Sequence, residues 1–110
     1  MKLGVGDRFG IMGLIQGQEG DFVTLKILRD LQGELAPSED EVKKLKIVQS
    51  NGRITWQEKA GEEKDVNIGE KANDIIVLAL AKLNEAKKLR QEHYNLYEMF
   101  IVKGNGDKET

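Results

Sequence analysis

The apolar residues of this chain recur mostly at the three- and four-residue spacing of an amphipathic helix. The clearest run begins at Asp21, a good N-cap, and ends before Pro37, whose ring excludes helical geometry at the preceding residue. Its apolar stripe comprises Val23, Leu25, Ile27, Leu28, Leu31 and Leu35. The pattern predicts a helix between Asp21 and Pro37 that buries this stripe.

A short helix is predicted directly after Pro37. Ser38 and Glu41 have the spacing of a capping box, in which each side chain satisfies the other residue's free backbone N–H. Acidic residues fill the first turn, and Lys43 and Lys44 follow in the last turn, which suits the helix dipole at both ends.

The stretch "NGRITW" (51–56) predicts a β-hairpin, because Asn51-Gly52 favours the two-residue turn in which both residues have positive φ. A two-residue loop pairs Val48 with Thr55. Ile47, Ile54, Trp56 and Gln49 then share one face, which we expect to pack on helices with Trp56 largely buried. Val66 and Ile68 alternate with polar residues and predict a third, shorter strand.

Residues 70–103 contain neither glycine nor proline and predict a long helical region with a break near residues 88–91. The segment "IIVLALA" (75–81) is apolar on every face, as in a helix buried on several sides. A last helix would carry His93, Leu96 and Phe100. We expect residues 1–103 to form one domain and the tail 104–110 to be disordered.

Six of the twelve glycines lie within the first 20 residues. Asp7 could cap a helix there, although Gly10 and Gly13 would each weaken it by about 1 kcal/mol. A phosphate-binding loop is the alternative interpretation, but Phe9 stands where the dinucleotide motif needs its third glycine, and no Gly-Lys-Ser/Thr follows. Close packing of a short helix explains these glycines better.

The amino-acid composition limits the catalytic and metal-binding chemistry that the chain could support. The chain has no cysteine, one histidine and two serines, and Ser38 belongs to a cap, so no nucleophile–base set is evident and we expect no enzyme. The acidic cluster lacks the calcium-loop pattern, and we predict no metal and no cofactor. No apolar run is long enough to span a membrane, so we expect a cytoplasmic protein.

The order of helices, short helix and hairpin is also that of a winged helix-turn-helix domain. In that alternative, Lys43, Lys44, Lys46 and Arg53 would contact nucleic acid. The net charge is −2 and acids lead the short helix, which argues against this interpretation. Nucleic acid is therefore a disfavoured partner.

The all-apolar segment predicts an interaction between copies of the chain. One domain of 110 residues offers few elements to cover every face of such a helix. We therefore predict a homodimer with Ile75, Val77 or Leu78 at the seam.

Five segments together resemble a group of small uncharacterised proteins from bacteriophages and environmental bacteria. They are "FVTLKILRDL", "SEDEVKKLKI", "GRITWQ", "IGEKANDIIVLALAKLNE" and "HYNLYEMF". The resemblance covers about residues 5 to 101. It implies a phage or mobile-element origin and supplies no activity.

We thus expect an α+β fold of four to five helices packed on a small antiparallel hairpin or three-stranded sheet. The expected function is a small non-enzymatic module that binds a host or phage protein. The alternative is a winged-helix DNA-binding regulator.

Overall fold

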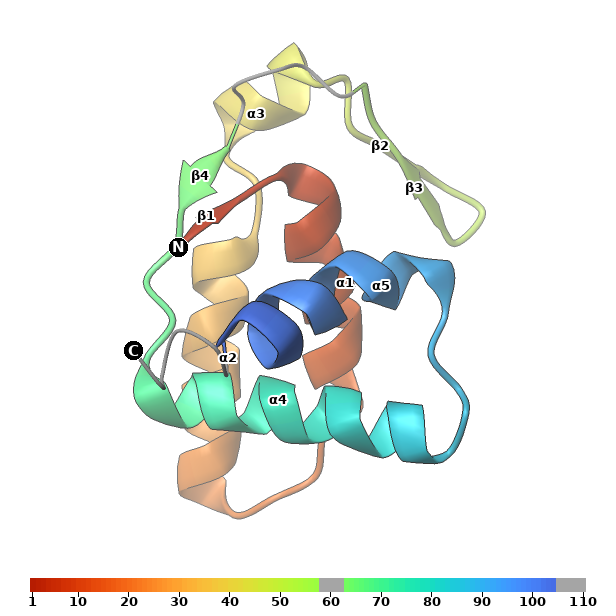
Figure 1. Cartoon of the computed structure of the whole chain (residues 1–110). Helices are drawn as coiled ribbons and strands as arrows, with labels where there is room; N and C mark the ends of the chain where they lie inside the picture. The colour runs from red at the N-terminus through yellow and green to blue at the C-terminus, as the bar shows by residue number, and fades with distance from the viewer. Residues whose placement is uncertain (58–62, 105–110) are drawn as a thin grey trace.

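A computed structural model describes residues 1–57 and 63–104 of the chain. The chain folds as a helical bundle with a smaller limb at one end, which consists of a short helix and the β-hairpin that follows it (residues 39–55; Figure 1). The described residues form five α-helices, one π-helical segment and two sheets of two strands each, which makes this an α+β fold. Their order is β1 (Lys2–Leu3), α1 (Val5–Gln16), α2 (Phe22–Leu35), α3 (Glu39–Lys44), β2 (Val48–Ser50), β3 (Arg53–Thr55), β4 (Lys64–Asp65), α4 (Glu70–Glu85), α5 (Gln91–Tyr97) and η1 (Glu98–Lys103).

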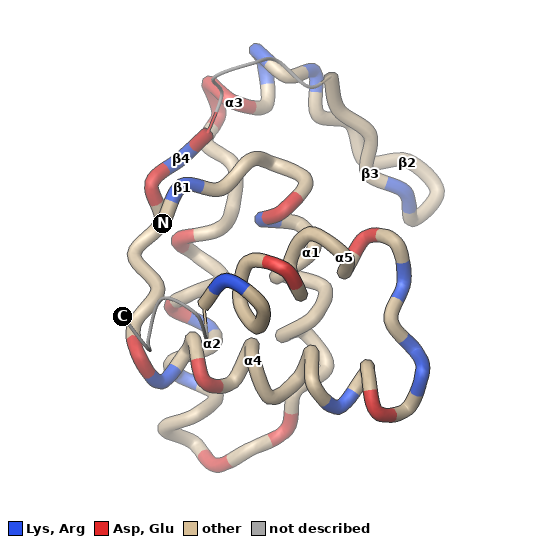
Figure 2. Tube along the Cα trace, in the orientation of Figure 1, with Lys and Arg blue, Asp and Glu red and all other residues tan. Residues whose placement is uncertain are grey.

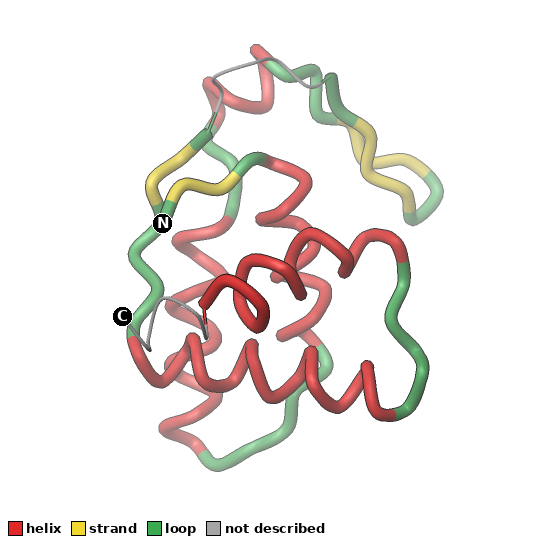
Figure 3. The backbone as a smooth tube through the Cα atoms, viewed as in Figure 1, coloured by secondary structure: helices red, strands yellow, loops and turns green. Residues whose placement is uncertain are grey.

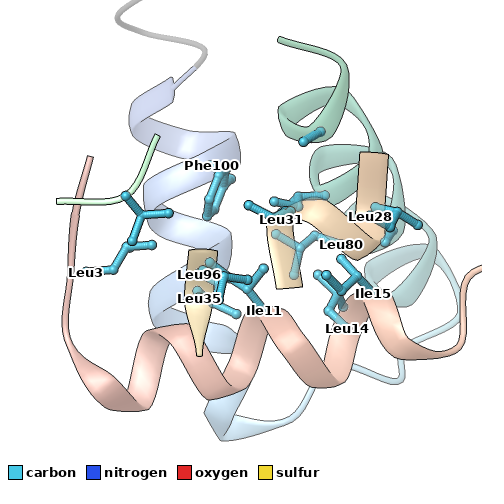
Figure 4. Close-up of a cluster of buried hydrophobic side chains, with 14 residues drawn as sticks. Leu3, Ile11, Leu14, Ile15, Leu28, Leu31, Leu35, Leu80, Leu96 and Phe100 are labelled. Atoms are coloured by element: carbon cyan, nitrogen blue, oxygen red, sulfur yellow. The ribbon is translucent and has the colours of Figure 1, made fainter. Parts of the chain in front are cut away.

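The core lies among α1, α2, α4, α5 and η1, where apolar stripes from all five segments meet (Figure 4). The stripe of α2 is buried from Leu28 through Leu31 to Leu35, as its spacing predicted. The same prediction is wrong for the first turn of α2, because Val23 is 60% exposed and Leu25 is 46% exposed. The bundle covers α2 only from its second turn onwards.

Helix α1 begins two residues earlier than Asp7, with Gly4 as its N-cap, so the expected capping by Asp7 is wrong. Asp7 lies in the first turn, where its negative charge suits the helix dipole. A Cβ placed on Gly10 would lie 3.0 Å from Leu96 Cδ1, whereas one on Gly13 would meet nothing within 4 Å. Gly10 therefore permits the close approach of α1 and α5, and close packing is confirmed at that position only.

The predicted break in the long helical region is confirmed, since α4 ends at Glu85 and α5 begins at Gln91. Lys87 adopts a φ of +58° in the connecting loop. The tail 104–110 was expected to be disordered. Gly104 directly follows η1, and the rest of that tail lies outside the described residues.

The hairpin has the predicted register, with Val48 opposite Thr55 and Gln49 opposite Ile54. Asn51 and Gly52 both have positive φ, at 53° and 76°, as their turn type requires. The expected packing of one face on the helices is wrong for the strands themselves, because every residue of β2 and β3 is exposed. Figure 3 shows the two strands set apart from the helices. Trp56 is half-buried rather than largely buried, and its ring lies 5.3 Å from that of Phe9.

The third strand forms at Lys64–Asp65 and not across Val66 and Ile68, where it was predicted, and it does not extend the hairpin. It pairs instead with β1, placing Lys2 opposite Asp65. The amino group of Met1 lies 2.9 Å from the Asp65 carboxylate. The next residue, Val66, is buried. The described strands thus form two separate sheets, and a single three-stranded sheet is not present among them.

Candidate protein-binding groove

A groove runs between α2 and the beginning of α4. It consists of two adjoining hollows of about 470 and 300 Å³, which share Ile27 and Lys71 in their walls. The wall formed by α2 comprises Asp21, Val23, Thr24, Ile27, Asp30, Leu31 and Glu34. The opposite wall comprises Asn67, Gly69, Glu70, Lys71, Ala72, Asp74 and Ile75. We call these residues the α2–α4 groove.

The α2 wall carries an apolar row that shares Leu31 with the buried stripe. Val23, Ile27 and Leu31 recur every four residues and therefore lie along one flank of the helix. Asp21 begins the helix, and its Oδ1 accepts a 2.8 Å hydrogen bond from the Thr24 backbone N–H. This cap orders the first turn although that turn is hardly packed, and so holds Val23 at the open end of the groove.

The α4 wall ends at Ile75, and Leu78 lies one turn beyond it, outside the lining of the groove. Ile75 is half-buried against the core, and Leu78, one turn further along the same helix, is 57% exposed. The prediction that "IIVLALA" is buried on most sides holds for Ile76, Ala79 and Leu80. It does not hold for Leu78, which no described element covers.

The rim of the groove carries mostly negative charge. Five carboxylates line it, against the single ammonium group of Lys71; they are Asp21, Asp30, Glu34, Glu70 and Asp74. Among residues 1–57 and 63–104, none of these carboxylates forms an ion pair. Lys64 reaches the end of the groove and donates to the Glu34 carbonyl oxygen at 2.9 Å. Figure 2 shows the acidic positions along α2 and at the start of α4.

The pKa of Asp21 lies below its usual value, chiefly because its carboxylate accepts hydrogen bonds from the backbone and side chain of Thr24. The positive charge of Lys71, across the groove, adds a smaller effect in the same direction. Asp21 is therefore ionised at neutral pH and contributes to the negative rim.

The three residues predicted at a dimer seam do not share one surface. Ile75 and Val77 are two positions apart and so lie about 200° apart around α4. Both are half-buried and pack against the core from opposite flanks of the helix. Leu78 is the accessible member, and it lies on the Ile75 side of α4, one turn further along the helix. The homodimer stays a prediction, with Leu78 as the centre of the contact.

The residues predicted to contact nucleic acid lie on the α3–hairpin limb. Lys43 and Lys44 form the last turn of α3, and Lys46 follows with a φ of +49°; all three are exposed at the base of the hairpin. Arg53 follows the turn at the other end of the hairpin. The four cations therefore form one cluster and one separate charge, and the acidic first turn of α3 lies beside the cluster (Figure 2).

Other chemistry finds little support in the described residues. No three His, Asp or Glu side chains gather there as metal ligands would. His93 is half-buried, and its Nδ1 accepts a hydrogen bond of 3.0 Å from the Arg90 backbone N–H at the start of α5. None of the helices in this part of the chain is both long and apolar enough to cross a membrane.

Two features of the structure were not predicted from the sequence: the exposure of the first turn of α2 and the burial of Arg8. Phe22, Val23 and Leu25 point in different directions around α2 and cannot all lie on one buried face, so their exposure could have been foreseen. Phe22 is 80% exposed. The burial of Arg8 had no such signal, because its partner Glu41 is 33 residues away and already had a role in the cap of α3.

Comparisons with known proteins yield no relative. No protein-family model matches the chain, no curated protein matches it, and no solved structure matches it. The function is therefore inferred from the groove itself.

Proposed function

We propose that this protein is a small non-enzymatic interaction module that binds another protein in the α2–α4 groove. The observation that carries the proposal is the exposed apolar surface there. Val23 is 60% exposed, and Ile27 and Ile75, which line the same hollow, are only half-buried. Apolar surface of this kind, rimmed by polar groups, is typical of sites that bind proteins.

The shape of the groove favours a polypeptide over a small molecule. Both hollows are open to solvent along the surface of α2, and the α2 wall from Val23 to Glu34 extends over about 16 Å at 1.5 Å per residue. Small-molecule sites are usually enclosed and bury most of the ligand surface. A peptide segment or helix of a partner would fill such an open groove.

A selection from a random peptide library displayed on particles tests the proposal. The protein is immobilised, and enriched peptides are then measured against Val23→Asp and Val48→Asp. Val23 and Val48 have similar exposure, at 60% and 54%, and Val48 lies on the distant hairpin. An aspartate in the first turn of α2 also suits the helix dipole, so the fold should persist.

We expect peptides that bind the wild-type protein and the Val48→Asp variant at least tenfold more tightly than the Val23→Asp variant. If no enriched peptide distinguishes the wild type from Val23→Asp, the groove is not a binding site and the proposal fails. Circular dichroism of the variants confirms that each is folded.

A phage or mobile-element origin is part of the proposal and rests on the sequence resemblance alone. Its partner would then be a host or phage protein.

DNA binding by a winged helix is the second candidate, favoured by the cluster of Lys43, Lys44 and Lys46 at the base of an exposed hairpin. A fluorescence anisotropy titration with duplex DNA at low salt tests it. Sub-micromolar affinity that falls steeply with added salt would place DNA binding first.

A further inference from the structure

We infer that the partner segment is a cationic amphipathic helix, with apolar side chains on the face that enters the groove and Lys or Arg along both edges. This inference rests on the proposed function and adds the chemistry of the partner. It follows from the backbone, the charge and the length of the α2–α4 groove.

The backbone of the groove favours a helical partner. Its walls are helices α2 and α4 with residues 67–69 before α4, and none of the described residues in it belongs to a strand. An extended peptide would find no strand edge there to pair with its own N–H and C=O groups. Because buried backbone groups must be hydrogen-bonded, a segment that pairs its backbone internally is favoured, and this is a helix.

The charge of the groove selects a cationic helix. Five carboxylates surround the apolar floor, and Lys71 is the only cation among the described lining residues. The whole chain has a net charge of only −2, so this rim is far more negative than the average surface. Apolar contacts alone would not discriminate between partners, whereas the rim would repel an acidic helix and attract a basic one.

The length of the groove sets the size of the contact. About 16 Å along α2 corresponds to three turns of a partner helix, which offers three apolar anchors at positions i, i+3 or i+4, and i+7. Val23 and Ile27 on α2 and Ile75 on α4 supply the complementary apolar surface, whereas Leu31 lines the groove but is only 4% exposed. A contact of this size is small for a protein interface, so we expect affinity in the micromolar range, as for transient complexes.

The hollow on the other flank of α2 is a weaker candidate. It measures about 290 Å³ and is lined by Ile15, Gln16, Gln18, Leu25, Leu28, Arg29 and Gln32. Its polar residues are three amides and one cation, so it has no charge pattern that would select a partner.

Three synthetic 18-residue peptides test the inference by fluorescence anisotropy. All carry the same leucine stripe at helical spacing, and their polar faces contain Lys and Gln, only Gln, or Glu and Gln. The peptides are titrated with the wild-type protein at 50 and 300 mM salt. We expect the Lys peptide to bind at least tenfold more tightly than the Gln peptide, and to lose most of this advantage at the higher salt.

Matched charge variants test whether the affinity for the Lys peptide depends on the carboxylates of the groove. The triple variant Asp30→Asn, Glu34→Gln, Asp74→Asn removes three carboxylates from the groove, and Glu19→Gln, Glu39→Gln, Glu85→Gln removes three exposed ones from elsewhere. Both change the net charge equally. We expect at least a tenfold loss of Lys-peptide affinity in the groove variant and less than a twofold change in the control.

Equal losses in the two triple variants would show general charge attraction and overturn the inference. Equal or tighter binding of the Gln or Glu peptide would overturn it as well, and would leave the proposed function intact if Val23→Asp still abolishes that binding. Absence of measurable binding by the Lys peptide would also overturn it, while the library selection decides independently whether the groove binds any peptide.

Discussion

The guanidinium group of Arg8 on α1 is bound by the carboxylate of Glu41 on α3. Arg8 Nη1 donates to Glu41 Oε1 at 3.0 Å, and Nη2 donates to Oε2. The side chain of Arg8 is only 1% exposed and that of Glu41 17%, and Arg8 is the only buried charged residue among those described. No residue of α3 is fully buried, so this pair, the buried Leu45 and the contact of Trp56 with Phe9 attach the limb to the bundle.

Removal of the Glu41 charge should destabilise the protein strongly. Glu41→Gln keeps the capping box, because glutamine also caps at this position, but leaves the Arg8 charge buried without a partner. We expect a loss of about 3–5 kcal/mol in the free energy of unfolding, as for other broken buried pairs. Urea denaturation measures it.

The double variant Arg8→Met, Glu41→Gln is the control, because it removes the buried charge together with its partner. It should recover much of the lost stability, since an apolar side chain of similar length needs no counter-ion. A double variant as unstable as Glu41→Gln alone would show that the pair matters through its shape and not its charge.

The stability should also depend on pH through Glu41. Its hydrogen bonds with Arg8 are the main reason that the pKa of Glu41 falls from 4.5 to about 2. A lowered pKa favours the folded state above pH 4.5, and this stabilisation is lost as the pH falls from 4.5 towards 2. The shift corresponds to about 3 kcal/mol at most, and to less after solvent screening.

Urea denaturation of the wild type and Glu41→Gln at pH 6 and pH 3 checks this dependence. The wild type should lose more stability between the two pH values than the variant, which has no carboxyl group at this position. The same loss in both proteins would assign the acid sensitivity to other carboxylates.

Alanine substitutions at two glycines of α1 should have different effects on the stability of the protein. Gly13→Ala places a methyl group in open space and should stabilise the protein by about 0.5–1 kcal/mol through helix propensity. Gly10→Ala places it 3.0 Å from Leu96 Cδ1, and the displaced packing should offset or exceed the same gain. The midpoint of thermal unfolding, measured for both variants, tests this difference. Equal stabilisation by the two substitutions would show that α1 and α5 are not closely packed.

Truncation of Trp56 should have a moderate effect. The ring is half-buried and packs against Phe9 with the planes inclined by 56°, so Trp56→Ala should cost about 1–2 kcal/mol instead of the 3–5 kcal/mol typical of a core tryptophan. Chemical denaturation followed by circular dichroism measures the loss. A value above about 3 kcal/mol would mean that the hairpin packs far more closely on α1.

The predicted homodimer can be tested by light scattering after size exclusion. We expect a mass of twice 12.4 kDa at high micromolar concentration, and a return to 12.4 kDa for Leu78→Asp without unfolding. A mass of 12.4 kDa for the wild type at all concentrations ends the dimer prediction.

Local signals in the sequence determined the elements of this protein. The Asp21 cap, the Ser38–Glu41 capping box and the Asn51-Gly52 turn all involve residues within three positions of each other, and the structure confirms each of them. The break before α5 is also confirmed. Such features depend on backbone groups that a neighbouring side chain can reach, so the order of residues is enough to predict them.

Tertiary structure decided which surfaces these elements cover. The hairpin has its predicted register, yet its strands face solvent. The pairing of β4 with β1 could not be predicted, because partners more than 60 residues apart leave no trace in local periodicity. Separation along the chain also hides the contact between Arg8 and Glu41, and the groove that α2 forms with α4. The apolar spacing of α2 and α4 was visible in the sequence, but only their packing showed which of those apolar side chains the bundle leaves uncovered.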